Sequence, residues 1–520
     1  MPSSEKRRSH PSIFEPSNLV LGVLFAVLGT VIGLELLTRV GITPNSSIIA
    51  AIFTIGLSRI PLSVFTHFRD LGRQNLMQTV ISAATFGGAN GILLPVGVLW
   101  LLGRVDLLPA MMVGAVAGVV IDATILFRLF GTRLFPAEGL WPSGVATAEC
   151  LIAGDRGGKR AALLAAGGTL GALGHPFGIP MDVFGVCWIG NIWALLMFGL
   201  GLIVRGYAHP VAGIDIEEGY VPHGFMIGAG LVAVVQIGVA VLRERMPSAA
   251  AGAPGIGRTL IQGYGAYCLA ASVMAAIAGL TTEMSTLMLA GFVLFAATAA
   301  IVSELIVGIA AMHSGWFPAF ATALIFLLIG MALGFPPLPL AFLVGFTAST
   351  GPAFADMGYD LKAGFILRGR GADPEYEREG RRAQFEAELL GIAVAALAVL
   401  FFHASYFERD LFPPWDRVAA ATIEAGASPS LAKALLLWAV PGALLQALGG
   451  PARQLGVLFA TGLLIRFPAA GWTAMISLAV RFFLTRRYGE RAESPMYVLA
   501  GGFIAGSALT SFGVATLKLK

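Results

Sequence analysis

Apolar stretches of about 20 residues follow one another along most of this chain, separated by short polar turns. A helix of roughly 20 apolar residues is long enough to cross the hydrocarbon core of a bilayer. The pattern therefore predicts an all-α polytopic membrane protein with about 14–16 transmembrane helices. The expected apolar runs lie at about 18–38, 46–66, 75–103, 108–131, 161–174, 183–204, 224–242, 259–280, 284–312, 317–334, 385–403, 431–448, 453–466, 468–485 and 494–517.

Two stretches, 135–154 and 335–352, are interrupted by prolines and small residues. Proline cannot occupy a helix interior without breaking the hydrogen-bond ladder. The first stretch contains Pro136 and Pro142 and then a carboxylate, Glu149, in an apolar environment. Irregular backbone at membrane depth is tolerated where it lines a cavity or is buried in protein. We therefore expect both stretches to be broken or re-entrant helices.

A weak internal repeat indicates two related halves. A shift of 326 positions places Pro468 on Pro142, and a shift of 334 positions places Gly501 on Gly167. Matches in the same order favour duplicated halves, an architecture of many secondary transporters. The predicted organisation is a cytoplasmic tail at 1–17, an N-terminal transmembrane half at 18–242, a linker at 243–258 and a C-terminal transmembrane half at 259–520.

The composition supports a multi-pass membrane protein. Hydrophobic residues make up 57% of the chain and charged residues only 12%, whereas a soluble domain carries about 25% charged residues. The net charge of +4 is modest for 520 residues, so nucleic acid is not an expected partner. The basic residues Lys6, Arg7 and Arg8 predict a cytoplasmic N-terminus, in the cell inner membrane if the source is bacterial.

No motif for a cofactor, a resident metal or an enzyme is visible. Cys150, Cys187 and Cys268 lie in apolar runs without the spacing of metal ligands, and we interpret them as small core residues. We find neither an HExxH motif nor a Gly-x-Ser-x-Gly elbow. An intramembrane enzyme is therefore less favoured than a transporter, and a purely structural membrane scaffold is the least favoured alternative, because nothing would maintain buried acids there.

Acidic residues inside apolar runs are the main candidates for chemistry, because a charge in the membrane is costly and usually functional. Glu149, Glu304 and Asp122 are the candidate proton-coupling residues, with Glu149 first. The alternatives are that Glu149 is satisfied by a neighbouring helix, and that Asp122 lies in an ion pair or near an interface.

Two basic side chains, Lys362 and His223, could each either contact the substrate or have a purely structural role. Lys362 could meet a substrate carboxylate or pair with Asp356 or Asp360. His223 follows Pro222 at an expected helix start and could contact substrate or simply lie at the interface. The charged segment 366–384 is most simply a solvated loop.

Three segments carry a resemblance to a known family: WPSGVATAE at 141–149, YVPHGFMIGAGLVAVVQIG at 220–238 and DMGYDLKAGFIL at 356–367. They resemble the oligopeptide transporter (OPT) superfamily, which includes the yellow-stripe-like metal–chelate transporters. The resemblance implies about 16 membrane helices and proton-coupled symport of peptides or peptide-like metal chelates. The chain lacks the Asn-Pro-Gly and Lys-Ile-Pro-Pro-Arg motifs of the eukaryotic peptide-transporting branch, which points to the bacterial or yellow-stripe-like side.

We expect a small zwitterionic or anionic substrate bound near the midplane, because helix N-termini at the breaks would attract carboxylates. A transporter of another small solute, an amino acid or a nucleobase, is the alternative. The sequence leaves open the substrate, the coupling stoichiometry and whether the chain forms a homo-oligomer. The candidate substrate-binding residues are Trp141, Ser143, Glu149, Tyr220, His223, Asp356 and Lys362.

Overall fold

The computed structural model is helical throughout the part of the chain that it describes, apart from turns and one isolated bridge between Phe130 and Phe135. The basic N-terminal tail to Arg8 and residues 244–254 of the expected linker lie outside the described residues. The described residues are 9–40, 46–62, 65, 67–217, 219–243, 255–315, 319–426, 429–465 and 467–517.

Most helices follow the predicted apolar runs. The helix bounds are α1 (Pro16–Val40), α2 (Ser46–Arg59), α4 (Leu71–Phe86), the π-helix η2 (Gly87–Leu93), α5 (Leu94–Leu101), α6 (Leu108–Leu129), α7 (Pro142–Arg156), α8 (Gly158–Gly174), α9 (Met181–Ile189), α10 (Ile192–Ala212), α11 (Val221–Arg243), α12 (Ile256–Ile277), α13 (Thr286–Ser314), α14 (Ala319–Ala332), α15 (Pro337–Ser349), α16 (Pro352–Leu367), α17 (Pro374–Phe407), α18 (Pro414–Ala425), α19 (Pro429–Arg453), α20 (Leu455–Leu464), α21 (Pro468–Tyr488) and α22 (Glu493–Leu517). The exceptions are α7 and α15, which lie in the two proline-rich stretches, α16, which begins at the end of the second stretch, and α18, which lies outside both the stretches and the runs.

Nine helical segments of the described chain are long and apolar enough to cross a membrane, and four shorter apolar helices accompany them. This confirms the predicted all-α polytopic membrane fold. Helices suit this setting because a helix satisfies its own backbone hydrogen bonds, which lipid cannot do. The sequence predicts about 14–16 crossings, more than these nine, because short and broken helices are included in that number. This larger number stays a prediction.

Both proline-rich stretches are interrupted, as predicted. Residues 135–141 form a turn before α7 begins at Pro142. The second stretch breaks between α15 and α16, where Gly351 has a φ of +104°. Only glycine adopts that backbone conformation readily, and the following Pro352 suits the first position of a new helix.

Two sequence expectations need correction. The run 183–204 is not one helix, because α9 and α10 are separated at Gly190 and Asn191. The Asn191 side chain accepts hydrogen bonds from the backbone N–H groups of Trp193 and Ala194, at 3.0 and 3.2 Å, and so begins a new helix.

The charged segment 366–384 is also not simply a solvated loop, because residues 374–384 form the first turns of α17. Within it, buried Glu377 accepts two hydrogen bonds from the guanidinium of Arg368, at 2.8 and 3.0 Å. Arg381 donates to the main-chain oxygens of Phe127 and Phe130. A planar guanidinium matches a carboxylate in this two-point geometry, so these charges dock α17 against its neighbours.

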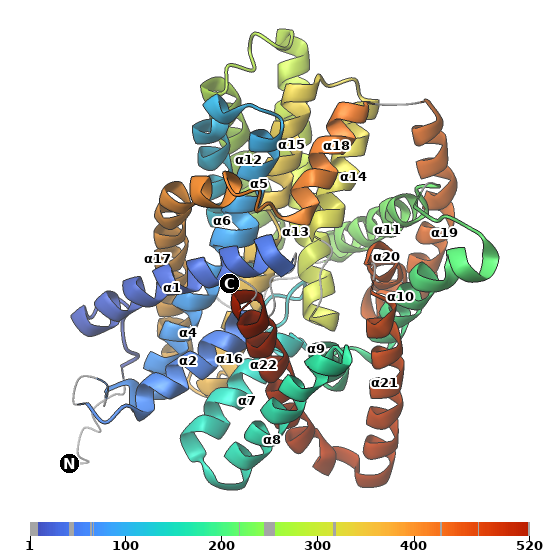
Figure 1. Ribbon diagram of the computed structural model, residues 1–520. Helices are drawn as coiled ribbons and strands as arrows, with labels where there is room; N and C mark the ends of the chain where they lie inside the picture. The colour runs from blue at the N-terminus through green and yellow to red at the C-terminus, as the bar shows by residue number, and fades with distance from the viewer. Residues whose placement is uncertain are drawn as a thin grey trace.

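Helices from the two predicted halves pack against one another. The helix α22 packs on α8 and α9, α10 packs on α20 and α21, and α17 packs on α4. In Figure 1, α19 stands beside α11 and α21 beside α10 on the right, and α22 runs past α7 and α8 at the bottom. The halves therefore share their packing surfaces, while the domain boundaries themselves stay a prediction.

Candidate functional site: a buried carboxylate network along helix α16

The N-terminus of α16 is capped by a carboxylate from another helix. Asp122, on α6, accepts hydrogen bonds from the backbone N–H groups of Gly351 at 2.7 Å and Phe354 at 2.9 Å. The first N–H groups of a helix have no partner within it, and a carboxylate there also complements the helix dipole. The expectation of a free helix N-terminus at this break is thus wrong, because Asp122 already occupies it.

Asp122 is joined to a second buried acid through a tyrosine. The Tyr267 hydroxyl, on α12, lies 2.6 Å from Glu304 Oε2 and 3.3 Å from Asp122 Oδ1. Both acids are fully buried. A phenol has a single proton, so Tyr267 can donate to only one of them at a time. Two of the three predicted proton-coupling residues, Asp122 and Glu304, are therefore in one network.

Further along α16, two aspartates share one face of the helix. Asp356 and Asp360 are four residues apart, a spacing that places side chains next to each other on a helix. Ser82 donates to Asp356 Oδ1 at 2.7 Å. Ser47 and Gln78 donate to Asp360 Oδ1 at 2.8 and 2.5 Å. These donors come from α2 and α4, so each aspartate has one satisfied oxygen.

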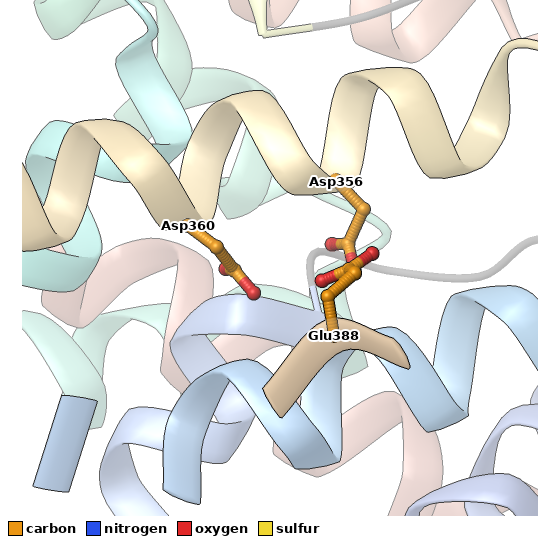
Figure 2. Close-up of side chains that lie close together, drawn as sticks. All are labelled: Asp356, Asp360 and Glu388. Atoms are coloured by element: carbon orange, nitrogen blue, oxygen red, sulfur yellow. The ribbon is translucent and has the colours of Figure 1, made fainter. Parts of the chain in front are cut away.

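Glu388 on α17 completes a cluster of three carboxylates, which we call the acid triad (Asp356, Asp360 and Glu388). Figure 2 shows Glu388 pointing from α17 towards the aspartates on α16, with its carboxyl close to that of Asp356. One oxygen from each residue lies within 4.8 Å of the others. Both oxygens of Glu388 and the Oδ2 atoms of both aspartates are buried without a hydrogen-bond partner in the described structure.

No basic side chain of the described residues lies within salt-bridge distance of the acid triad. Lys362 Nζ donates to the main-chain oxygen of Ala137 at 2.8 Å. Lys362 is two residues from Asp360, and residues at that spacing do not face each other on a helix. Of the two readings of Lys362, pairing with Asp356 or Asp360 is therefore ruled out, and substrate contact stays a prediction.

The first turn of α7 packs closely on α16. The ring of Trp141 lies edge-on to Tyr359, with centroids 6.1 Å apart. A side chain at Gly144 would collide with the main-chain oxygen of Tyr359, so the crossing needs glycine there. The Ser143 hydroxyl is buried and has no partner among the described residues. This crossing places the predicted residues Trp141 and Ser143 against the helix that carries Lys362.

Glu149 lies in an ion pair with a residue of the next helix. Its carboxylate lies 2.9 Å from the guanidinium of Arg160, and the two side chains are 15% and 29% exposed. Arg160 also donates to the Ser494 hydroxyl. The structure shows the alternative in which a neighbouring helix satisfies Glu149, because α8 supplies the counter-charge, while the role of Glu149 as a proton carrier stays a prediction.

Tyr220 and His223 lie together at the start of α11, with ring centroids 6.0 Å apart. His223 Nδ1 is buried without a partner in the described structure. The helix α11 packs mainly on α19 and α20 rather than on α16. The structure thus does not bring these two predicted residues to the acid triad.

Sequence reasoning missed Tyr267 and Glu388 and treated Asp360 only as a partner for Lys362. Glu388 lies inside the apolar run 385–403, so the criterion that selected Glu304 also applies to it. The four-residue spacing of Asp356 and Asp360 was a further signal. Tyr267 gave none, because an aromatic residue in an apolar helix is usually a packing residue.

A comparison of the chain with curated proteins finds no significant match. The family model described as OPT oligopeptide transporter protein matches residues 17–243 and 262–518. Because these residues cover nearly the whole sequence, the chain belongs to the OPT oligopeptide transporter family, a family of membrane transporters.

Proposed function

We propose that this chain is a secondary transporter that uses a proton gradient to take up short peptides or carboxylate-rich metal chelates. The observation that carries the proposal is the network in which Asp122 caps α16 and connects through Tyr267 to Glu304. Intramembrane acids mark proton relays in many transporters. Here such an acid directly holds the end of a broken helix.

The proposed coupling acts through the cap. When it is ionised, Asp122 accepts hydrogen bonds from two backbone N–H groups at the start of α16. Hydrogen bonds to a charged acceptor are stronger than those between two neutral groups. A proton on Asp122 removes the charge and weakens both bonds. Proton entry would therefore loosen the end of α16 from α6, which is the kind of two-state element that alternating access requires.

The substrate side of the proposal rests on Lys362. Its ammonium group is held by a neutral carbonyl of the 135–141 turn rather than by an acid. Lys362 is only 2% exposed, so a substrate carboxylate would reach it when that turn moves. Trp141, the last residue of the turn, and Ser143, just after it, would then lie beside the entering substrate.

Uptake into proteoliposomes tests this function directly. The purified protein is offered a mixed pool of short peptides, metal chelates, amino acids and nucleobases, and the accumulated compounds are identified by mass spectrometry. We expect peptides or chelates to accumulate only with an inward proton gradient and to be lost after addition of a protonophore. Gradient-independent accumulation, or accumulation of nucleobases alone, would contradict the proposal.

Variants of the acids identify the proton carrier. We expect Glu304→Gln and Asp122→Asn to abolish accumulation against a gradient while leaving downhill exchange measurable. Glu149→Gln is the comparison, since sequence reasoning ranked it first. If Glu149→Gln alone removes the pH dependence and Glu304→Gln does not, the carrier is Glu149 and the proposed network is structural.

Two variants separate the readings of Lys362. Lys362→Met should lose substrate binding, whereas Lys362→Arg should retain part of it, because arginine keeps the charge. Calorimetry on the purified protein measures both affinities. Unaltered affinity in Lys362→Met would remove this residue from the substrate site.

A further inference from the structure

We propose that the acid triad binds one divalent, oxygen-liganded cation of about the size of Ca²⁺. The proposal concerns Asp356, Asp360 and Glu388, which come from α16 and α17 and converge on one point (Figure 2). It does not depend on the transported substrate or on the proton carrier.

The first argument is that most oxygens of the triad have no hydrogen-bond donor in the described structure. Each aspartate gives Oδ1 to donors of the protein and leaves Oδ2 without one. Glu388, only 1% exposed, comes from a separate helix and leaves both oxygens unpartnered. Buried polar groups are nearly always hydrogen-bonded, so four unsatisfied oxygens in one cluster indicate a ligand that accepts their lone pairs.

The second argument is charge. Three carboxylates at this separation, away from water, would repel one another strongly if all were ionised. The neighbouring cations are engaged elsewhere, Lys362 with Ala137 and Arg368 with Glu377. A divalent cation would offset two of the three negative charges, and hydrogen bonds from Ser82, Ser47 and Gln78 disperse the remaining one.

The third argument is ligand type and spacing. The three ligands are carboxylates, with hydroxyl and amide groups behind them, a set that suits hard cations rather than Cu⁺ or Zn²⁺. Two ligands of one ion can be at most two bond lengths apart. One oxygen of each residue lies within 4.8 Å of the others, so one ion could contact all three. Because Mg²⁺ gives up its waters reluctantly and is seldom held in dry, all-protein sites, the burial of the triad favours Ca²⁺.

The structural consequence would be a clamp between α16 and α17. The aspartates lie on the second and third turns of α16, a short distance from the end that Asp122 caps. A bound ion would therefore hold the middle of α16 on α17, whatever happens at its N-terminus.

The test is direct binding to the purified full-length chain in lipid nanodiscs. After treatment with a chelator, the protein is titrated separately with CaCl₂, MgCl₂ and NaCl, and binding is followed by calorimetry and by the unfolding temperature. We expect one Ca²⁺ per chain, bound more tightly than Mg²⁺ or Na⁺, with a rise in unfolding temperature because the ion binds only the folded state.

Matched variants locate the site. Glu388→Gln and Asp360→Asn should each weaken Ca²⁺ binding by at least about tenfold, as loss of a ligand or its support does elsewhere. Asp416→Asn is the control, because Asp416 is an equally buried acid on α18 whose oxygens also lack partners in the described structure. The Asp416→Asn variant should bind Ca²⁺ with the affinity of the wild-type protein.

If a variant does not fold, the wild-type protein still gives an answer, because Ca²⁺ binding to carboxylates shifts their infrared stretching bands. Absence of saturable Ca²⁺ binding, tighter binding of Na⁺ or Mg²⁺, or equal loss in Asp416→Asn would overturn the proposal. Since no transport is measured, failure here leaves the proposed uptake untouched, and failure of uptake leaves this site untouched.

Discussion

The N-terminus and the middle of helix α16 accommodate buried acidic side chains in different ways. At its N-terminus, Asp122 is matched by two backbone N–H groups and a tyrosine hydroxyl. In its middle, Asp356 and Asp360 share the acid triad with Glu388, and most of the triad's oxygens have no donor in the described structure. At the N-terminus the capping oxygen of Asp122 has its donors, whereas in the middle of the helix four carboxylate oxygens have none in the described structure.

The difference follows from where each acid is placed. Asp122 faces the end of a helix, where unpaired N–H groups are always available. The triad faces the sides of α2, α4 and α17, where main-chain donors are used inside the helices and only side chains can donate. An acid at a helix end can thus be structural by itself, whereas an acid cluster between helix sides needs protons or a cation.

The largest expected effect is loss of the cap. Asp122→Ala leaves the N–H groups of Gly351 and Phe354 buried without a partner, and each lost hydrogen bond to a charged group contributes about 1.5–3 kcal/mol. We expect the free energy of unfolding in mixed micelles to fall by about 3 kcal/mol or more. Asp122→Asn keeps one acceptor oxygen and should lose less. Equal loss in both variants would show that the charge, and not the acceptor, matters.

Removing one carboxylate of the acid triad should raise the unfolding free energy rather than lower it. In the presence of a chelator, Glu388→Gln removes one of three crowded charges, and replacing such buried charges is often stabilising by about 1–4 kcal/mol. We therefore expect a higher unfolding free energy than that of the wild type without Ca²⁺. The order should reverse when Ca²⁺ is added. A loss of stability under both conditions would mean that Glu388 is already satisfied.

A smaller effect is expected at the link between the two acids of the N-terminal network. Tyr267→Phe removes one hydroxyl while keeping the ring, which packs edge-on against Phe346. The expected loss is about 1.5–3 kcal/mol in the unfolding free energy, the range for one hydrogen bond to a charged group. Added to Glu304→Met, which has no oxygen to accept this hydrogen bond, the same change should cost almost nothing more, because both variants remove one interaction. Full additivity would show that the hydroxyl serves Asp122 alone.

Much of this contrast could be foreseen from the sequence, and some of it could not. The broken helix before Pro352 and the membrane fold follow from proline positions and apolar runs, which are local properties. The pairing of Asp122 with α16 joins residues more than 200 positions apart, and no spacing in the sequence encodes it. The sequence also does not reveal that Arg160 pairs with Glu149. A basic residue after a glycine-rich turn is equally compatible with a side chain that points into solvent.

The smallest expected effect on stability concerns Glu149, which was the first candidate proton-coupling residue from the sequence. Its partner Arg160 is partly exposed and has a second acceptor in Ser494. Partly exposed ion pairs contribute about 0–1 kcal/mol, so Glu149→Gln should change the unfolding free energy by less than about 1 kcal/mol.

Comparison with Glu304→Gln makes this test informative about function. If the buried network carries the proton, uptake by Glu149→Gln should keep the pH dependence of the wild type, whereas Glu304→Gln should lose it. Arg160→Gln is the matched control, because it removes the same ion pair from the other side. Should both Glu149→Gln and Arg160→Gln abolish gradient-driven uptake while the protein stays folded, the ion pair itself is part of the coupling, and the difference between the acid capping α16 and the paired acid on α7 would no longer hold.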